Sequence, residues 1–265
     1  MKIIDFHTHY FPNELATRAI SQIRDFVPLM KNHTDGTLFG LKESMKNSNI
    51  AMAVTLPVAT KPTQVKIINN VVIELNEENI IPFGAIHPDF KNFKDEISRL
   101  KEGGIKGIKL HPEYQNFLAD DPKLFPIYEE LSASKLITLF HAGKDPWPIR
   151  NRGAYPLRIK KVVDNFPKLK IVAAHLGGWD MWEDVYNILA SENLFFDTSA
   201  IIKRVDENLF MKIVKKHGLE KVLFGTDSPW LSQKESIEYI EKMPLSNAET
   251  DMIFYKNASE LLNIQ

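Results

Sequence analysis

The sequence predicts an α/β protein built as a (β/α)8 barrel (a TIM barrel), with an extra helix at its C-terminal end. Three observations favour this fold. Short, apolar, β-rich runs alternate with longer helical patterns along the 265 residues, which is typical of βα units and a parallel sheet. Several runs, such as residues 50–56, are apolar on both faces, as burial beneath helices requires. Eight such runs fit a barrel better than a doubly wound open sheet, which remains the structural alternative.

The individual elements follow from local pattern. Strands are expected where apolar and β-branched residues gather between turn-forming residues, over 2–6, 51–56, 81–86, 105–110, 136–140, 169–174, 194–197 and 222–226. Helical periodicity predicts helices between them, over 63–79, 93–102, 123–134, 155–165, 182–190, 207–217 and 233–243.

Two stretches depart from this regular spacing. Residues 10–49 separate the first two strands and are long for one connection, so we expect an extra helix or a lid there. A last helical pattern over 248–262 follows the helix of the eighth strand and should pack across the barrel. No linker or internal repeat divides the sequence, so residues 1–265 are expected to form a single domain.

Composition excludes several classes of function. The formal net charge of −1 gives no general attraction to nucleic acid or to an anionic membrane. No apolar stretch approaches the ~18–20 residues that cross a bilayer, and the N-terminus lacks a signal-peptide layout. A cytoplasmic location is therefore the default expectation. Because the sequence has no Cys, any metal must bind nitrogen and oxygen ligands.

Residues that can bind a metal end five of the apolar runs, and a parallel barrel brings such strand ends to one face. His7 and His9 are two positions apart on the first strand and point to the same side. His141 ends the fifth strand, and Asp227 follows the eighth. Three imidazoles and one carboxylate suit a zinc-like ion with room for a water molecule. We expect these four residues to be metal ligands and Asp227 also to accept a proton.

Five further residues complete the predicted site. His175 ends the sixth strand and is expected to be a second-metal ligand, an acid or base, or a substrate ligand. Lys109 and His111 share one face of the fourth strand, where either can hold a substrate carboxylate. In the loop after the fifth strand, Trp147 and Arg150 suit an anionic substrate in a pocket with aromatic walls.

Three histidines are left outside this site. His87, before a proline at the end of the third strand, is interpreted as a structural hydrogen-bonding residue. His33 and His217 are interpreted as surface residues.

The order of these motifs resembles the amidohydrolase superfamily and, within it, most closely the amidohydrolase-related (amidohydrolase 2) family. The segments that carry the resemblance are 7–9, His141, 171–178, 194–199, 225–229 and 257–262. The resemblance implies a metal-dependent barrel of the hydrolase type, whose main chemistries are hydrolysis and non-oxidative decarboxylation. It also implies one or two divalent ions, zinc first and manganese as the alternative. Barrels of this family often pair, so a homodimer is one expectation.

In the resemblance to this family, the chemical state of Lys109 determines whether the site holds one metal ion or two. Its position is similar to that of a lysine that dihydroorotase-type relatives carboxylate to bridge two metals. If Lys109 is carboxylated, it and His175 become ligands of a second ion. If it is unmodified, its amine is available to a substrate carboxylate.

The leading expectation is a metal-dependent hydrolase of a small anionic substrate, such as a lactone, cyclic amide or ester. Metal-activated water attacks the carbonyl group, Asp227 takes the proton, and His175 or Lys109 stabilises the developing charge. The alternative is a metal-dependent non-oxidative decarboxylase of an aromatic or dienoic carboxylic acid, in which Asp227 or His175 delivers a proton to carbon. A third hypothesis is a barrel that binds metal or ligand without turnover.

Overall fold

The computed structural model describes residues 2–26, 31–145 and 152–264. In this part of the chain nine strands pair in parallel as two sheets. The first sheet contains, in order, β1 (Ile4–Thr8), β2 (Met52–Thr55) and β3 (Ile80–Pro82). The second contains, in order, β4 (Gly84–Ala85), β5 (Gly107–Leu110), β6 (Ile137–Phe140), β7 (Ile171–Ala173), β8 (Phe195–Asp197) and β9 (Val222–Leu223).

The two sheets adjoin at both seams. Only Phe83 separates β3 from β4, so these two segments together form the single strand predicted over 81–86. At the other seam, Phe6 N–H donates to the Phe224 carbonyl at 2.7 Å, and Asp227 N–H donates to the His7 carbonyl at 2.8 Å. The regular ladder is interrupted at these seams, but eight strand positions follow one another in the order of a barrel.

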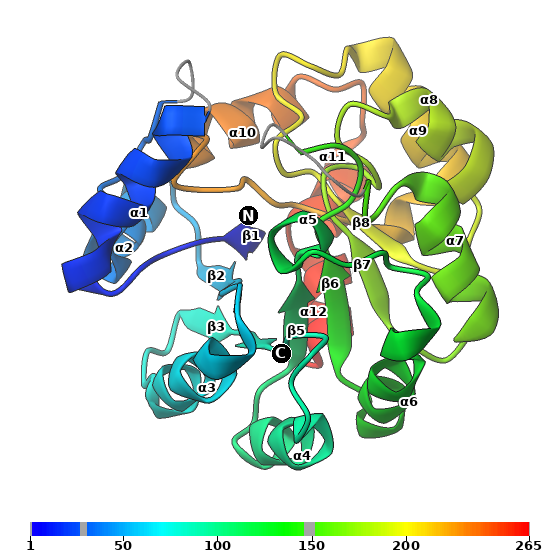
Figure 1. Cartoon of the computed structure of the whole chain (residues 1–265). Helices are drawn as coiled ribbons and strands as arrows, with labels where there is room; N and C mark the ends of the chain where they lie inside the picture. The colour runs from blue at the N-terminus through cyan, green and yellow to red at the C-terminus, as the bar shows by residue number, and fades with distance from the viewer. Residues whose placement is uncertain (1, 27–30, 146–151, 265) are drawn as a thin grey trace.

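Helices surround the strands (Figure 1). Between β2 and β9 they are α3 (Val65–Glu74), α4 (Phe93–Glu102), α5 (Pro112–Gln115), α6 (Phe125–Ser134), α7 (Pro156–Asn165), α8 (Trp182–Asp184) and α9 (Glu207–His217). After β9 come α10 (Gln233–Glu241), α11 (Asn247–Asp251) and α12 (Asn257–Leu262). The bounds of α4 and α9 agree with the predicted helices. The helices predicted over 182–190 and 248–262 each contain a π-helical segment, Val185–Leu189 and Met252–Lys256.

The long connection between β1 and β2 contains two helices, α1 (Asn13–Phe26) and α2 (Leu38–Asn47). The Thr37 side chain accepts the Gly40 N–H and caps the start of α2. Leu41 and Met45 of α2 are buried, and α2 contacts α10. The predicted extra helix is therefore present, together with a second one.

The interior of the barrel is filled by side chains from alternate strand positions, among them Ile137 and Leu139 of β6. Gly107 of β5 makes room for this core, because a Cβ there would collide with the Phe83 ring. Leu261 and Leu262 of α12 belong to the same cluster, and α12 contacts β1 and β9. The predicted C-terminal helix thus packs against the interior of the barrel. No helix within the described ranges is both long and apolar enough to span a membrane.

Candidate metal centre

Three residues predicted as metal ligands meet at the seam of the barrel. His7 and His9 lie at the end of β1, and Asp227 follows β9. Oδ1 of Asp227 lies 3.4 Å from His7 Nε2 and 3.2 Å from His9 Nε2. The ends of the first and last strands therefore bring His7, His9 and Asp227 together.

Three more of the predicted residues lie beside this group, on neighbouring strands. Lys109 of β5 is buried, and its Nζ lies 3.3 Å from His7 Nε2. His141 and His175 follow β6 and β7, and His141 Nδ1 lies 3.0 Å from His175 Nε2. Trp147 and Arg150, the predicted substrate-binding residues of the following loop, lie outside the described residues.

The backbone leaves the strands abruptly at two of these residues. His175 has a φ of 61° and Asp227 a φ of 71°, both in the left-handed region that a non-glycine residue adopts at a cost of about 1–3 kcal/mol. Surrounding hydrogen bonds hold both conformations. The Trp182 indole donates to the His175 carbonyl at 3.0 Å, and the Asp227 N–H is bonded to β1. Such backbone outliers are concentrated at functional sites.

Hydrogen bonds set the tautomers of His7 and His9. His7 Nδ1 lies 2.8 Å from Asp197 Oδ2, and His9 Nδ1 lies 2.8 Å from the Leu56 carbonyl. An ionised carboxylate and a carbonyl can only accept, so both Nδ1 atoms carry the proton. In the neutral form of either ring, Nε2 then carries a lone pair, which faces the carboxylate of Asp227.

The same reasoning applies to His141 and His175. His141 Nε2 lies 3.0 Å from the Lys144 carbonyl, so it donates, and its lone pair is on Nδ1. His175 Nδ1 lies 3.2 Å from the Ser199 carbonyl, so its lone pair is on Nε2. These two lone pairs face each other at 3.0 Å. Facing lone pairs repel unless a cation or a proton lies between them.

Burial keeps the rings of His7, His141 and His175 neutral. Burial, aided by the Lys109 cation, lowers the pKa of His7 to about 3. Burial also lowers the pKa of His141 well below its usual range and lowers that of His175. The neutral rings of His7, His141 and His175 therefore lie near the Asp227 carboxylate.

The donor set fits a divalent metal ion. Two ligands of one tetrahedral ion with bonds of about 2.0–2.1 Å lie about 3.3–3.4 Å apart. The distances from Asp227 Oδ1 to His7 Nε2 and His9 Nε2, 3.4 and 3.2 Å, are close to that value. The facing nitrogens of His141 and His175, 3.0 Å apart, form a second pair beside them. Imidazole and carboxylate ligands are those that zinc uses, and manganese also takes them.

A second group, His111, His141 and Asp145, is close enough to suggest another metal site but has the wrong tautomers. His111 Nδ1 accepts the Tyr114 N–H at 3.3 Å, so the proton of the neutral ring is on Nε2, 3.6 Å from Asp145 Oδ2. His141 Nε2, also protonated, lies 3.5 Å from the same oxygen. Both rings thus direct N–H groups at the carboxylate. His111, predicted to bind substrate, is buried and stacked between Tyr114 and His141.

Sequence reasoning missed three buried residues next to the centre. Asp197 and Ser199 were noted only as part of a family motif, although Asp197 ends the seventh strand and the strand-end rule could have found it. Asp5 lies at the β1–β9 seam, where Oδ2 accepts from Thr226 Oγ1 at 2.6 Å and from Gln233 Nε2 at 2.8 Å. Burial raises the pKa of Asp5 to about 7. These hydrogen bonds join strands that the ladder leaves unpaired.

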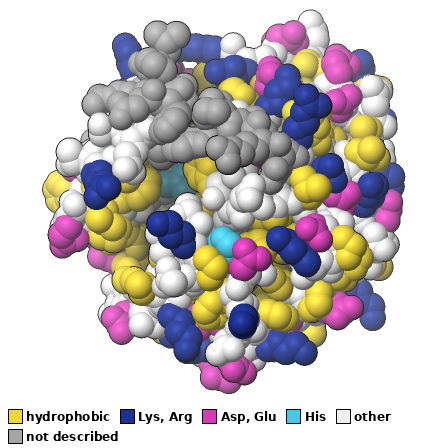
Figure 2. Space-filling model, in the orientation of Figure 1, with side chains coloured by type: hydrophobic (Ala, Val, Ile, Leu, Met, Phe, Trp, Pro, Cys, Tyr) yellow, Lys and Arg dark blue, Asp and Glu magenta, His cyan; other side chains and the backbone are white. Residues whose placement is uncertain are grey.

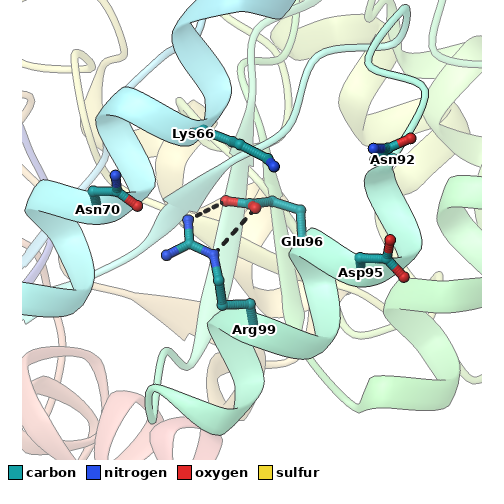
Figure 3. A pocket seen from close by; sticks show the side chains of 6 residues that line it. All are labelled: Lys66, Asn70, Asn92, Asp95, Glu96 and Arg99. Carbon is teal, nitrogen blue, oxygen red and sulfur yellow. Dashed lines mark hydrogen bonds and ion pairs between the residues drawn. The ribbon is translucent and has the colours of Figure 1, made fainter.

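The surface of the molecule is hollowed beside the grey residues, and a histidine side chain is visible inside this hollow (Figure 2). A separate cavity of about 280 Å³ lies between α3 and α4 on the outside of the barrel (Figure 3). It is lined by Lys66, Asn70, Asn92, Asp95, Glu96 and Arg99. Its buried carboxylate, Glu96, is already paired with Arg99 and bonded to Asn69. The outer cavity therefore offers no group comparable to the centre at the strand ends.

Two curated proteins match parts of the chain. A decarboxylase, orsB, from Emericella nidulans is 22% identical over 125 residues, 39% of this chain and 37% of that protein. A dihydroorotase from Helicobacter acinonychis is 27% identical over 151 residues, 52% of this chain and 44% of that protein. In both cases the match spans less than half the length of the relative.

Solved structures match over nearly the whole chain. A TIM-barrel protein from Bordetella bronchiseptica is 20% identical with a TM-score of 0.79, covering 99% of both chains. A 5-carboxyvanillate decarboxylase from Sphingomonas paucimobilis is 16% identical with a TM-score of 0.75, covering 100% of this chain and 99% of that one. A dihydroxybenzoic acid decarboxylase from Polaromonas sp. JS666, with bound manganese and 2-nitroresorcinol, is 17% identical with a TM-score of 0.76, covering 99% and 97%. These likenesses confirm the predicted TIM barrel.

The sequence profile of one family, described as Amidohydrolase, matches residues 4–264, nearly the full length of the chain. This match confirms the resemblance seen in the strand-end motifs. The chain therefore belongs to the amidohydrolase family and is an enzyme of that superfamily, with His and Asp groups suited to a divalent metal ion.

Proposed function

We propose that the chain is a metal-dependent, non-oxidative decarboxylase of an aromatic or dienoic carboxylic acid. The observation that carries the proposal is the convergence of imidazole lone pairs and the Asp227 carboxylate on one space beside the Lys109 amine. Similarity to two decarboxylases of aromatic acids over the whole chain supports this alternative over the hydrolase that we expected first. The proposal includes residues 1–265 as a single domain.

His7, His9, His141 and Asp227 would hold the ion, and His175 lies beside them. A bound zinc or manganese ion supplies a Lewis acid that holds and polarises anionic oxygens of the substrate. Lys109 supplies a fixed cation in the same space. Burial lowers the pKa of Lys109 to about 8. At neutral pH its amine is therefore mostly protonated and can donate hydrogen bonds to a substrate carboxylate.

Asp227 is the proposed proton carrier. Its Oδ atom takes the proton of an acidic substrate hydroxyl as the substrate binds. It then delivers that proton to the ring carbon that carries the carboxylate, while the carbon–carbon bond breaks and its electron pair forms the new C–H bond. The products are carbon dioxide and the protonated ring, and water returns the hydroxyl proton on release. Lys109 and His175 are buried, which limits the access of bulk water to the space around them.

Hydrolysis of a small anionic lactone, cyclic amide or ester is the second candidate. The observation that favours it is the buried Lys109, together with the dihydroorotase match over about half of the chain. In that reaction a carboxylated Lys109 and His175 would hold a second ion, and Asp227 would take the proton of the attacking water.

Release of labelled carbon dioxide tests the proposal. Protein reconstituted with zinc or manganese is incubated with a panel of carboxyl-labelled hydroxybenzoic and dienoic acids, and with lactones and dihydroorotate. We expect carbon dioxide from an acid of the panel, and about 10²–10⁴-fold slower release from the Asp227→Asn variant. Ring opening without carbon dioxide release would replace the proposal with the hydrolase. No turnover of any compound by the metal-loaded protein would favour a barrel that only binds.

A further inference from the structure

Asp197 and Ser199 lie behind the ring of His7, on the side away from Asp227. Asp197 is completely buried and accepts from four groups. Oδ2 accepts from His7 Nδ1 at 2.8 Å. Oδ1 accepts from the His175 N–H and the Ser199 N–H, each at 3.0 Å, and from the Ser199 hydroxyl. One carboxylate thus connects the ends of β1, β7 and β8.

Ser199 extends this connection to the second ring. Its Oγ lies 3.0 Å from His7 Nδ1 and 2.8 Å from His175 Nδ1. Because its own proton goes to Asp197, the hydroxyl oxygen can only accept from these rings. Both Nδ1 atoms are therefore donors. His7, His175 and Asp197 are close enough together to suggest a metal site, but their facing nitrogens carry protons.

The space for this arrangement depends on a glycine. A Cβ at Gly225 would lie 2.9 Å from the His7 Cβ and 3.3 Å from the Asp197 Cβ, closer than side chains normally approach. The glycine of the Gly225-Thr226-Asp227 motif therefore lets the carboxylate lie directly against the His7 ring.

We propose that Asp197 is a positioning residue that fixes the Nδ1–H tautomer and the orientation of His7, with Ser199 as its weaker counterpart for His175. Both leave Nε2 as a lone pair that faces the proposed metal centre. The inference rests on that centre but not on the reaction it performs. Hydrogen-bond partners of metal-bound histidines typically change metal affinity by about 10–100-fold when they are removed.

An amide cannot replace this carboxylate. Asparagine has one accepting oxygen, and its NH2 group can only donate. With its oxygen turned to the two backbone N–H groups, its NH2 faces His7 Nδ1, which must then accept. The neutral ring would carry its proton on Nε2 and lose the lone pair that faces Asp227. Asp197→Asn should therefore change the tautomer of His7 while it changes the shape of the side chain at position 197 very little.

The test is zinc affinity of the metal-free full-length protein, measured by competition with a chromophoric chelator, together with ¹⁵N NMR of the ring nitrogens. We expect Asp197→Asn to weaken zinc binding by about 10–100-fold and to move the His7 proton to Nε2. Ser199→Ala should weaken binding by about fivefold, since it removes one neutral hydrogen bond. The control is Glu96→Gln, another buried carboxylate exchanged for an amide, between α3 and α4, which should leave zinc affinity unchanged.

Wild-type zinc affinity in Asp197→Asn would overturn the inference. If that variant does not fold by circular dichroism, the wild-type NMR spectrum decides alone, and a His7 proton on Nε2 would overturn it equally. This outcome differs from a failure of the proposed reaction. If the protein is not a decarboxylase, no carbon dioxide is released, but zinc affinity and the His7 tautomer still respond to Asp197→Asn as described.

Discussion

Asp227→Asn is predicted to stabilise the metal-free protein while it weakens the metal centre. In the metal-free structure the Asp227 carboxylate faces the Nε2 lone pairs of His7 and His9 at 3.4 and 3.2 Å. An asparagine NH2 at the same place can donate to both. Two neutral hydrogen bonds at about 0.5–1 kcal/mol each add roughly 1–2 kcal/mol to the free energy of unfolding.

For a chain of 265 residues this gain raises the Tm by roughly 2–5 °C. The amide also removes the anionic ligand, so the rise in Tm that zinc gives the wild type should shrink in the variant. Differential scanning calorimetry at pH 8, with and without zinc, measures both effects. Turnover should fall by about 10²–10⁴-fold, since the proton carrier is lost.

The matched control is Asp120→Asn on the outside of the barrel. Asp120 pairs with the cations of Arg158 and Lys161, so the same exchange removes attraction and should lower the Tm slightly. A lower Tm of metal-free Asp227→Asn would refute the assignment of lone pairs to His7 and His9.

Three further predictions concern other residues. His9→Ala should reduce bound zinc well below one equivalent per chain. The circular dichroism spectrum should change little, because His9 lies beyond the packed interior. Unchanged zinc content would show that His9 is not a ligand. Asp5→Ala should lower the free energy of unfolding, measured in urea, by about 2–4 kcal/mol, because it leaves the buried donors of Thr226 and Gln233 unpaired. An unchanged urea midpoint would contradict this role for Asp5 at the seam. His217 is buried and stacked on Phe196, and burial lowers its pKa to about 3. Above that pH the folded protein keeps the ring neutral, whereas the unfolded chain binds a proton near the ordinary pKa of histidine. The wild type should therefore lose roughly 2 kcal/mol more between pH 7 and pH 5 than His217→Phe, and equal losses in the two proteins would contradict the burial of a neutral ring.

The fold was predictable because its signals are local and repeat along the chain. The strands of the barrel and helices α4 and α9 lie where apolar runs and helical periodicity place them. Two differences have physical causes. The third strand is divided at Phe83, where it changes partners from β2 to β5. The helices predicted over 182–190 and 248–262 contain π-helical turns, which the average period of a helix does not reveal.

The candidate site was predictable as far as topology determines it. Parallel strands end on one face, and this rule alone brought His7, His141 and Asp227 into one list. It does not give the direction of a hydrogen bond. Asp197 also ends a strand, so the rule could have listed it, but the rule does not show that Asp197 accepts a hydrogen bond from His7.

One histidine was placed wrongly for a similar reason. His217, interpreted as a surface residue, is buried against Phe196, since the last turn of α9 faces β8. The ring of His111 is stacked between Tyr114 and His141, and its predicted contact with substrate stays a prediction. Packing between neighbouring elements decides which histidines are buried, and a single sequence contains little signal for it.

The most direct test of the metal centre is the number of metal equivalents per chain after reconstitution with zinc or manganese and exhaustive dialysis, measured by inductively coupled plasma mass spectrometry. The account predicts about one equivalent, held by His7, His9, His141 and Asp227. Two equivalents would contradict the single centre and point to a carboxylated Lys109. No retained metal in a folded protein would contradict the centre itself.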